Sequence, residues 1–396
     1  MHNKKRTLHG DKISLAPCAI LWYNGCIDHK GPLGLPQETF MDEYIAVALS
    51  PSDRRAQEQM DELLAREGIA RDKNLTYSAG IWDDEGRLIA TGSIFGNTLR
   101  CLAVDGDHRG EGLMAVIVSH LVQVQMERGN MHLFLYTKCE SAKYFSPLGF
   151  TEIARVGDRL VFMENRRDGF ARHIASLTSL LKDTPGNAGS LDVPGAALVM
   201  NANPFTNGHA YLLERAAREN ARVVLFVLSE DRSLVPYADR LAMVRAAAAQ
   251  YDNVALVPSG SYMISAATFP SYFLKDDATV TRTHAQLDAT LFIPIAKALN
   301  LTRRYVGEEP FSQATDLYNQ ALANVLPDAG VELAVIPRAE QAGTPISASH
   351  VRALIHDGRL EEIRPLVPAT TYDYLTGPAG SRAVANIRAA KDVIHH

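Results

Sequence analysis

Short apolar runs alternate with helical patterns along the second half of the chain. Each run has the length of a strand that is buried on both faces of a sheet. The runs occupy residues 196–200, 223–228, 254–258, 304–306 and 333–336. Apolar residues at helical spacing fill the intervals, over 237–250, 287–299 and 315–326. This alternation predicts an α/β domain with a doubly wound parallel sheet, whose ligands bind at the carboxyl ends of the strands.

The first half has a different pattern, in which short strands follow one another closely. Apolar segments at 77–82 and 88–95 flank a polar turn and predict a hairpin. A third strand at 99–104 leads through a glycine-rich loop into a long helix at 114–128. We therefore expect an α+β domain in this half. A further strand is predicted at 132–137, and helices are predicted at 51–67 and 170–181.

The boundary between the halves falls in a cluster of Pro, Gly and Ser at 183–190, which is typical of a linker. A chain of 396 residues is also expected to contain two domains rather than one. The expected division is an N-terminal extension of unclear role at 1–44, the α+β domain at 45–170, a helix and linker at 171–192, the parallel-sheet domain at 193–370 and a C-terminal tail at 371–396.

Composition narrows the class of partner. The net charge is −5, so no global basic field recruits nucleic acid or a membrane, and neither is expected as a partner. A phosphate site in such a chain must place its cations locally. The four cysteines lack metal-ligand spacing, and we find neither a convincing signal peptide nor an apolar run that could span a bilayer. These features lead us to expect a cytoplasmic protein with reduced thiols.

Two segments have the chemistry of phosphate sites. The first follows the strand 196–200, where a polar turn leads into a helix that begins near Gly208. The first-turn N–H groups of that helix attract anions, and His209 can donate a further hydrogen bond. The second segment lies far downstream, where Ser347 and Ser349 begin another helix and Arg352 follows one turn later. Together they predict two clamps for one polyphosphate.

These segments, read as Thr206-Asn-Gly-His209 and Ile346-Ser-Ala-Ser-His-Val-Arg352, resemble the marks of the nucleotidylyltransferase superfamily. The resemblance implies a Rossmann-like nucleotidylyltransferase domain that binds ATP together with Mg²⁺. In that family a histidine often stands where this chain has Thr206, so only one imidazole is available in this loop.

The first domain carries a second resemblance. Its glycine-rich loop contains Arg109 and Gly112, and Gly149-Phe150 follows the next helix, as in GNAT-type N-acetyltransferases. The resemblance implies a GNAT-like fold with a loop for an acyl-CoA pyrophosphate. Phe145, however, stands where the family usually has a general-acid tyrosine, and a phenyl ring cannot protonate a thiolate. We expect this domain to hold a CoA-like group without transferring acetyl; the alternative is a scaffold that binds nothing.

With the further segments 270–275, 284–288 and 306–310, residues 75–370 are similar to the citrate lyase ligase family. That resemblance implies a ligase that converts acetate and ATP into acetyl-AMP and pyrophosphate. The acetyl group would then pass to the thiol of the CoA-derived prosthetic group on the acyl carrier (gamma) subunit of citrate lyase.

The expected roles follow the motifs. His209 and Arg352 are assigned to catalysis, and Arg240 and Lys275 to possible phosphate or acetate contacts, with a surface ion pair as the alternative for each. His284 and Asp288 are interpreted as a surface hydrogen bond, and no protein metal ligands are predicted. The CoA-like arm is assigned to Arg109, Gly110 and Gly112. The nucleotide is assigned to Asn201, Asn203, Pro204, Phe205, Thr206, Gly208, Ser347, Ser349 and Glu308.

Two other functions remain open at this level. A small-molecule nucleotidylyltransferase, such as a phosphopantetheine adenylyltransferase, would share both clamps. A non-catalytic module that senses acyl-CoA or nucleotide would use them only for binding. Pyrophosphate release that depends on acetate would favour the ligase over both.

Overall fold

The computed structural model describes residues 44–229, 233–263, 269–270, 272, 274, 276–308, 313–341 and 343–393, without the side chains of 313–315. Residues 1–43 of the expected N-terminal extension and Lys275 lie outside the described residues. In the part of the chain that is described, no helix is long and apolar enough to cross a membrane.

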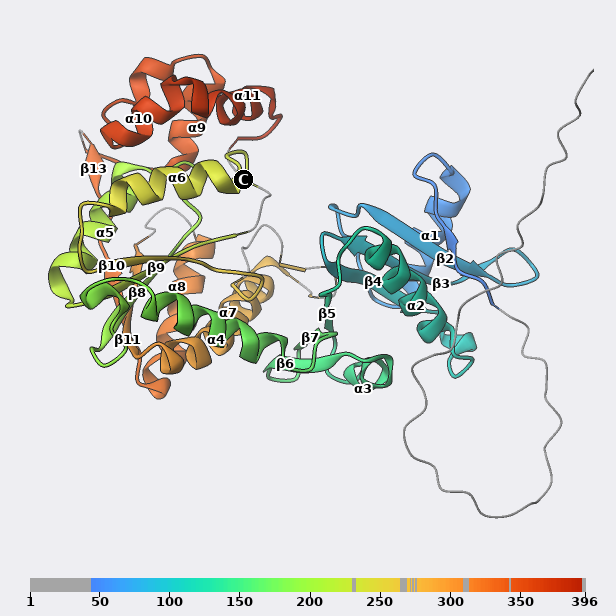
Figure 1. Ribbon diagram of the computed structural model, residues 1–396. Coiled ribbons are helices and arrows are strands. Elements are labelled where there is room, and N and C mark those ends of the chain that lie inside the picture. The colour runs from blue at the N-terminus through green and yellow to red at the C-terminus, as the bar shows by residue number, and fades with distance from the viewer. Residues whose placement is uncertain are drawn as a thin grey trace, which may run out of the picture. The chain divides into compact units, whose positions relative to one another are not determined.

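The first domain is built on a seven-stranded sheet in the order β1-β2-β3-β4-β5-β7-β6 (Figure 1). The predicted hairpin is confirmed as β2 paired antiparallel with β3. Apart from the parallel pair β4 and β5, neighbouring strands of this sheet are antiparallel. The strands are β1 (Val47–Ala48), β2 (Tyr77–Trp82), β3 (Leu88–Phe95), β4 (Thr98–Val104), β5 (Phe134–Thr137), β6 (Thr151–Val156) and β7 (Leu160–Glu164).

Helices α1 (Arg54–Arg66), α2 (Leu113–Glu127) and α3 (Ala142–Phe145) accompany this sheet. Leu113, Ile117 and Leu121 of α2 are buried in the same core as the strands. Gly92 of β3 permits the close approach, because a Cβ atom there would lie 2.6 Å from Ile117 Cγ2. The glycine-rich loop therefore joins β4 to a helix that is firmly packed on the sheet.

The second domain confirms the doubly wound prediction. Its five strands are all parallel, in the order β10-β9-β8-β11-β12. The chain winds outward from β8 to β10 and then returns to β11 beside β8, so the strand order reverses between β8 and β11. The strands are β8 (Gly195–Met200), β9 (Val223–Val227), β10 (Val254–Pro258), β11 (Leu301–Gly307) and β12 (Glu332–Ile336), with a small hairpin of β13 (Glu340–Gln341) and β14 (Thr344–Pro345).

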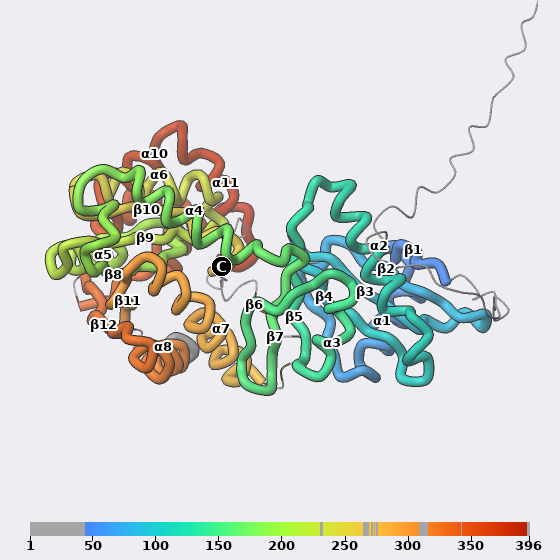
Figure 2. The backbone as a smooth tube through the Cα atoms, turned by 60° about the horizontal axis from the view of Figure 1, so that its bottom comes forward, coloured from blue at the N-terminus to red at the C-terminus, as the bar shows by residue number. Residues whose placement is uncertain are grey.

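Helices cover both faces of the parallel sheet (Figures 1 and 2). One face packs against α5 (Asn207–Glu219), α6 (Tyr237–Ala248) and α9 (Ala348–His356). The other face packs against α4 (Gly169–Lys182), α7 (Asp277–Ala298) and α8 (Gln313–Val325). Successive strand residues alternate between the two cores, since Ala196 and Leu198 belong to the first and Ala197 to the second. This two-sided burial explains why the strands are almost wholly apolar.

The interpretation of residues 371–396 as a tail is wrong for the described part. This segment contains most of α10 (Ala369–Thr376) and all of α11 (Ser381–Ala389). Tyr372, Leu375 and Ile387 are buried in the same core as Val351 of α9. Both helices are short, so their apolar residues form only one or two turns of pattern, too few to be recognised without the surface that they cover.

Candidate functional site

The loop that follows β8 lies at the point where the strand order reverses. It leaves the sheet at Met200, and α5 begins at Asn207. The Asn207 amide donates to the Leu366 carbonyl at 2.9 Å, which fixes the start of the helix against the C-terminal part of the domain. Ligands of doubly wound domains bind at this reversal, beyond the carboxyl ends of the strands. The predicted nucleotide loop therefore lies at this reversal point, and its role stays a prediction.

His209 lies in the first turn of α5 and is held by Thr206. The Thr206 N–H donates to His209 Nδ1 at 3.0 Å, and the Thr206 hydroxyl oxygen accepts from the His209 N–H at 3.4 Å. Since Nδ1 accepts a hydrogen bond, the neutral ring carries its proton on Nε2. Phe205 stacks on the imidazole with ring centroids 5.6 Å apart, which further fixes its orientation. His209 therefore offers an oriented Nε2–H donor.

The imidazole is also kept neutral. Burial, with a smaller contribution from the positive charge of Arg338, lowers the pKa of His209 from 6.5 to about 4. The ring is thus an uncharged donor near neutral pH, so its interaction with a phosphate is a hydrogen bond rather than an ion pair.

The predicted second clamp comes to the same place. Ser347 caps α9, because its Oγ accepts from the His350 N–H at 3.1 Å, and Ser349 Oγ lies 3.1 Å from Ser347 Oγ. A Cβ atom placed on Gly208 would lie 3.4 Å from the Ile346 carbonyl oxygen. The N-termini of α5 and α9, which are more than a hundred residues apart in sequence, are therefore in contact. Their first-turn N–H groups and dipoles both favour an anion there.

Arg352 has a different environment from the one expected for a phosphate ligand. It is 3% exposed, and its Nη1 donates to the Asn203 carbonyl at 2.7 Å while Nε donates to the Val393 carbonyl at 2.6 Å. Burial lowers its pKa, although the nearby Asp392 opposes that shift. Arg352 thus ties the loop after β8 to the C-terminal segment.

Arg240 has a similar place within the protein. It is fully buried, and its Nη1 donates to the carbonyls of Asn201 and Leu228 at 2.9 and 2.8 Å. Nε donates to the Val235 carbonyl at 3.1 Å. The surface ion pair that we considered for Arg240 is therefore wrong, because the side chain is enclosed by backbone carbonyls that could not be inferred from the sequence.

The two asparagines of the loop are also engaged within it. Asn201 Oδ1 accepts from Arg240 Nη1 at 2.9 Å and its Nδ2 donates to Ser233 Oγ at 3.0 Å. Asn203 Oδ1 accepts from the Val235 N–H at 3.0 Å. Pro204 and Phe205 are buried. These predicted nucleotide-binding residues thus shape the loop through their side-chain contacts.

The carboxyl ends of β11 and β12 contribute two more charged residues. The exposed Glu308 follows β11 directly, and its amide donates to the Ile336 carbonyl at 2.8 Å. Arg338 follows β12 by two residues and is partly buried. Arg338 lies outside both sequence motifs, although an arginine two residues beyond a predicted strand of a parallel sheet is a usable signal.

The glycine-rich loop of the first domain leads to the bare N-terminus of α2. Gly110 and Gly112 have φ of +96° and +78°, and no side chain caps the helix. Arg109 is paired with Glu67, with Nη2 2.6 Å from Oε2, and its side chain is 69% exposed. Phe145 is 3% exposed in the core, whereas Tyr144 is 57% exposed. The structure therefore gives Phe145 a packing role.

His284 and Asp288 were interpreted as a surface pair, and that interpretation is wrong. Both are buried, at 6% and 4% exposure. Asp288 Oδ2 accepts from the Tyr318 hydroxyl at 2.8 Å and lies 2.7 Å from Arg304 Nη1, while the His284 ring packs on that of Tyr318. The buried partners come from β11 and α8, so the spacing of the pair within α7 alone could not reveal them.

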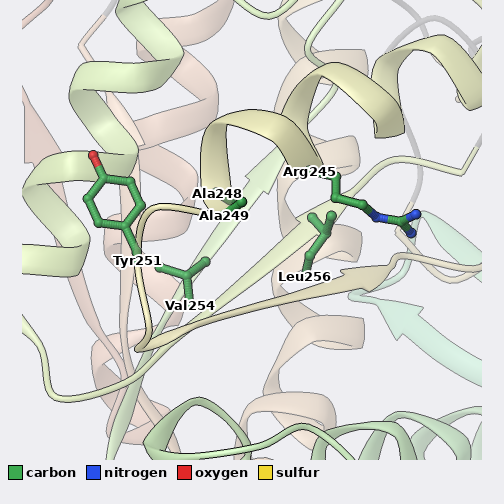
Figure 3. A pocket seen from close by; sticks show the side chains of 6 residues that line it. All are labelled: Arg245, Ala248, Ala249, Tyr251, Val254 and Leu256. Atoms are coloured by element: carbon green, nitrogen blue, oxygen red, sulfur yellow. The ribbon is translucent and has the colours of Figure 1, made fainter. Parts of the chain in front are cut away.

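One hollow of the second domain lies away from the loop after β8. A hollow beside the end of α6 is lined in part by Val254, the first residue of β10 (Figure 3). It therefore lies toward the amino ends of the strands, whereas the loop after β8 lies at their carboxyl ends. It is lined by Arg245, Ala248, Ala249, Tyr251, Val254 and Leu256. Among the described residues, no three His, Cys, Asp or Glu side chains gather as a set that could hold a metal ion.

Comparison with known proteins shows which family this chain resembles. Residues 195–375 match the model of the citrate lyase ligase C-terminal domain. The chain resembles the citrate (pro-3S)-lyase ligase of Klebsiella pneumoniae, with 37% identity over 82% of this chain and 93% of that protein. It also resembles the enzyme of the same name from Escherichia coli strain K12, with 36% identity over 82% of this chain and 91% of that one.

Among solved structures, a putative acyl-CoA N-acyltransferase from Klebsiella pneumoniae matches with a TM-score of 0.27 and 18% identity, covering 31% of this chain and 95% of that chain. TmcAL from Thermotoga maritima, bound to alpha-thio ATP, matches with a TM-score of 0.31 and 14% identity, covering 46% of this chain and 55% of that chain. The identity to the two ligases extends over most of both sequences. The chain therefore belongs to the citrate lyase ligase family.

Proposed function

We propose that this ligase activates acetate with ATP to form enzyme-bound acetyl-AMP, and then acetylates a CoA-like thiol on the acyl carrier subunit of citrate lyase. The observation that carries the proposal is the contact between the N-termini of α5 and α9 beside the oriented, neutral His209. The names of the relatives supply the acceptor, since both are ligases of citrate (pro-3S)-lyase. The phosphopantetheine adenylyltransferase alternative is not favoured, because these relatives are ligases.

In the first step a carboxylate oxygen of acetate attacks the α-phosphorus of ATP. A new P–O bond forms, the bond between the α-phosphorus and the bridging oxygen breaks, and pyrophosphate leaves with its electron pair. Two anions must approach each other, so the barrier is largely electrostatic. The Nε2–H of His209 and the first-turn N–H groups of α5 would stabilise the charge on the α-phosphate without a proton transfer. Those of α9, with Ser347 and Ser349, would hold the departing pyrophosphate.

The buried arginines support this step indirectly. Arg352 and Arg240 each hold carbonyl groups of the loop after β8. We therefore assign both to positioning of that loop, whose peptide N–H groups approach the nucleotide. Glu308 is exposed at the end of β11, where its carboxylate could accept hydrogen bonds from a ribose. Pro204, Phe205 and Gly208 would act through the shape of the loop.

In the second step the carrier thiol attacks the carbonyl carbon of acetyl-AMP. A C–S bond forms, the C–O bond to AMP breaks, and the thiol proton is released. We propose that the first domain holds the CoA-like arm through Arg109, Gly110 and Gly112, which raises the local concentration of the thiol. The buried Phe145 supplies no proton in this scheme.

ATP normally brings Mg²⁺, which neutralises phosphate charge. Among the described residues, no three His, Cys, Asp or Glu side chains form a set of metal ligands. The two steps above are therefore assigned to the chain's own residues.

The decisive experiment is exchange of labelled pyrophosphate into ATP, with and without acetate, in the full chain. Exchange should require acetate and should continue without any carrier protein. His209→Ala should lower it by at least about a hundredfold, the scale for loss of a preorganised donor. Exchange that requires a phosphorylated acceptor instead of acetate would support the adenylyltransferase alternative, and absence of exchange would support a sensor.

A further inference from the structure

The question at this site is which side chain places a positive charge beside the phosphates of the nucleotide. His209 is neutral near pH 7, and the guanidinium groups of Arg240 and Arg352 contact backbone carbonyls inside the domain. The chain as a whole carries a net charge of −5. Lys275, the other cation that the motifs indicate, lies outside the described residues. A nucleoside triphosphate carries several negative charges, so a further cation among the described residues would strengthen its binding.

We propose that Arg338 is this cation and that it contacts a phosphate group of the bound nucleoside triphosphate. The proposal rests on the function proposed above and adds to it a residue that lies outside both sequence motifs. It assigns to Arg338 the role that the sequence had suggested for Arg352.

The backbone places Arg338 at the correct edge of the sheet. Strand β12 ends at Ile336 and runs parallel to β11 and, through it, to β8, so all three carboxyl ends share one edge. Arg338 stands two residues beyond that end. It therefore emerges on the same side of the domain as the loop that leads to His209.

Two backbone contacts connect Arg338 to the start of α5. The neighbouring Ala339 carbonyl accepts from the Ile346 N–H at 3.0 Å, at the base of the β13–β14 hairpin. The Ile346 carbonyl in turn lies against Gly208, 3.4 Å from the position of an added Cβ atom. The residue beside Arg338 is thus linked through one residue, Ile346, to the first turn that carries His209.

Electrostatics give the same location. The positive charge of Arg338 contributes to the lowered pKa of His209, which agrees with the position that the backbone gives Arg338 beyond β12. Arg338 is partly buried, and its own pKa is lowered by that burial. A phosphate between the two side chains would receive a neutral donor from one and a full charge from the other. Guanidinium groups suit this role because they can donate two parallel hydrogen bonds to a phosphate.

A structural role for Arg338 in the β13–β14 hairpin is the competing explanation. It predicts that removing the charge alters stability and all ligands alike. The proposed role predicts an effect that depends on the phosphates of the ligand, so the two explanations differ in a binding measurement that needs no turnover.

The experiment compares Arg338→Gln and Arg338→Lys in the full chain, with Arg218→Gln as the matched control. Arg218 lies in the last turn of α5, at the end remote from the site, and is 77% exposed. Calorimetric titration with ATP and with adenosine is measured without acetate. Arg338→Gln should weaken ATP binding about 10- to 100-fold, the range for loss of a charge-assisted hydrogen bond, and leave adenosine binding unchanged. Arg338→Lys should lose less, and Arg218→Gln should lose nothing.

A second measurement tests proximity in the ligand-free protein. The pKa of His209 is followed by NMR of ¹³C-labelled histidine, with His209→Gln to assign the signal. Arg338→Gln should raise that pKa, and Arg218→Gln should not. An unchanged His209 pKa, unchanged ATP affinity, or an equal loss of ATP and adenosine affinity would each overturn the proposal.

These outcomes separate the inference from the proposed function. Wild-type protein that binds ATP through Arg338 but shows no acetate-dependent exchange would refute the ligase chemistry and leave Arg338 in place. Exchange that is unaffected by Arg338→Gln, together with unchanged ATP affinity, would refute Arg338 and leave the ligase chemistry. Wild-type protein that does not bind ATP would refute both.

Discussion

The backbone N–H of Thr206 donates to Nδ1 of His209 at 3.0 Å, so the residue that caps α5 also decides which nitrogen of the neutral imidazole carries the proton. His209 lies three positions after Thr206, and its own N–H donates to the Thr206 hydroxyl oxygen at 3.4 Å. The same two hydrogen bonds therefore cap the helix and orient the proposed catalytic imidazole. Changes that weaken the cap should also disorder the imidazole.

Thr206→Val tests this coupling, because it removes the hydroxyl and keeps the branched shape. Loss of an N-cap side chain should lower the free energy of unfolding by about 1 kcal/mol. Pyrophosphate exchange should fall several-fold, less than in His209→Ala, since the Thr206 N–H still holds Nδ1. Urea unfolding and exchange assays measure the two effects, and Thr206→Ser should restore both. Full exchange activity in a destabilised Thr206→Val protein would show that the cap and the imidazole are independent.

The lowered pKa of His209 makes a prediction about stability in acid. The pKa of His209 is about 4 in the folded protein, whereas in the unfolded chain the imidazole has its ordinary pKa of 6.5. The unfolded state therefore binds more protons between these values, and stability falls as pH decreases through that window. At pH 5 the loss relative to pH 7 should be about 2 kcal/mol from this group.

Urea unfolding of wild type and His209→Gln at pH 7 and pH 5 checks this value. The variant lacks the titrating group, so the difference in unfolding free energy between the two proteins should change by about 2 kcal/mol between these pH values. A difference that is the same at both pH values would mean that His209 titrates normally in the folded protein. Above pH 5, the pH profile of exchange activity in wild type should contain no ionisation step that is missing from the profile of His209→Gln.

Arg352→Ala should affect folding as well as activity. The change leaves the buried carbonyl of Asn203 and the partly buried carbonyl of Val393 without this donor, and each such loss costs up to about 1–3 kcal/mol. We therefore expect a loss of about 2–5 kcal/mol in unfolding free energy, together with weaker exchange because the loop after β8 loses a constraint. Arg352→Lys should rescue little, since one ammonium group cannot reproduce the guanidinium geometry.

Urea unfolding measured beside ATP titration identifies the role of Arg352. The exposed Arg359, which pairs with Glu362, supplies the control Arg359→Ala. If Arg352→Ala lowers ATP affinity strongly while its unfolding free energy equals that of wild type, Arg352 is a phosphate ligand after all and the positioning role is wrong.

The sequence was sufficient where local pattern and final environment coincide. The strand β8 is buried on both faces, so its apolar run identified it, and the turn chemistry of residues 201–208 located the start of α5 nearly to the residue. The resemblance of the two motifs also predicts that the segments containing Gly208 and Ile346 belong to one site. These features depend on neighbours in the sequence or on the two motifs that carry the resemblance.

The sequence was insufficient where a side chain meets backbone from a distant segment. Arg352 contacts a carbonyl 41 residues away at Val393, and Arg240 contacts one 39 residues away at Asn201. Carbonyl groups are present at every position, so sequence offers no mark of such partners. Arg338 is a different case, because the predicted strand 333–336 already ends where β12 ends. A single arginine outside both motifs has no periodicity to mark it, so its position after a strand was the signal available from sequence.

The last prediction concerns transfer to the carrier, and it uses the loop between β4 and α2. Arg109 is exposed and lies beside Glu67, at the bare N-terminus of α2. Arg109→Glu would place two carboxylates together and repel the phosphates of a CoA-like arm. Acetate-dependent pyrophosphate exchange should remain within about twofold of wild type, while acetylation of the carrier should slow by about tenfold or more, as expected when the gain from local concentration is lost.

Exchange of labelled pyrophosphate and mass measurement of the acetylated carrier report the two half-reactions separately. Glu67→Gln is the matched control, because it removes the partner of Arg109 and retains the cation, so carrier acetylation should be preserved or faster. Raising ionic strength should slow wild type more than Arg109→Glu, since the attraction between Arg109 and the arm is screened by salt. If Arg109→Glu acetylates the carrier at the wild-type rate, the arm does not pass over this loop, and the first domain has no part in presenting the thiol. If exchange and acetylation fall together, the loop instead affects formation of acetyl-AMP, and the proposed division of labour between the two domains is wrong.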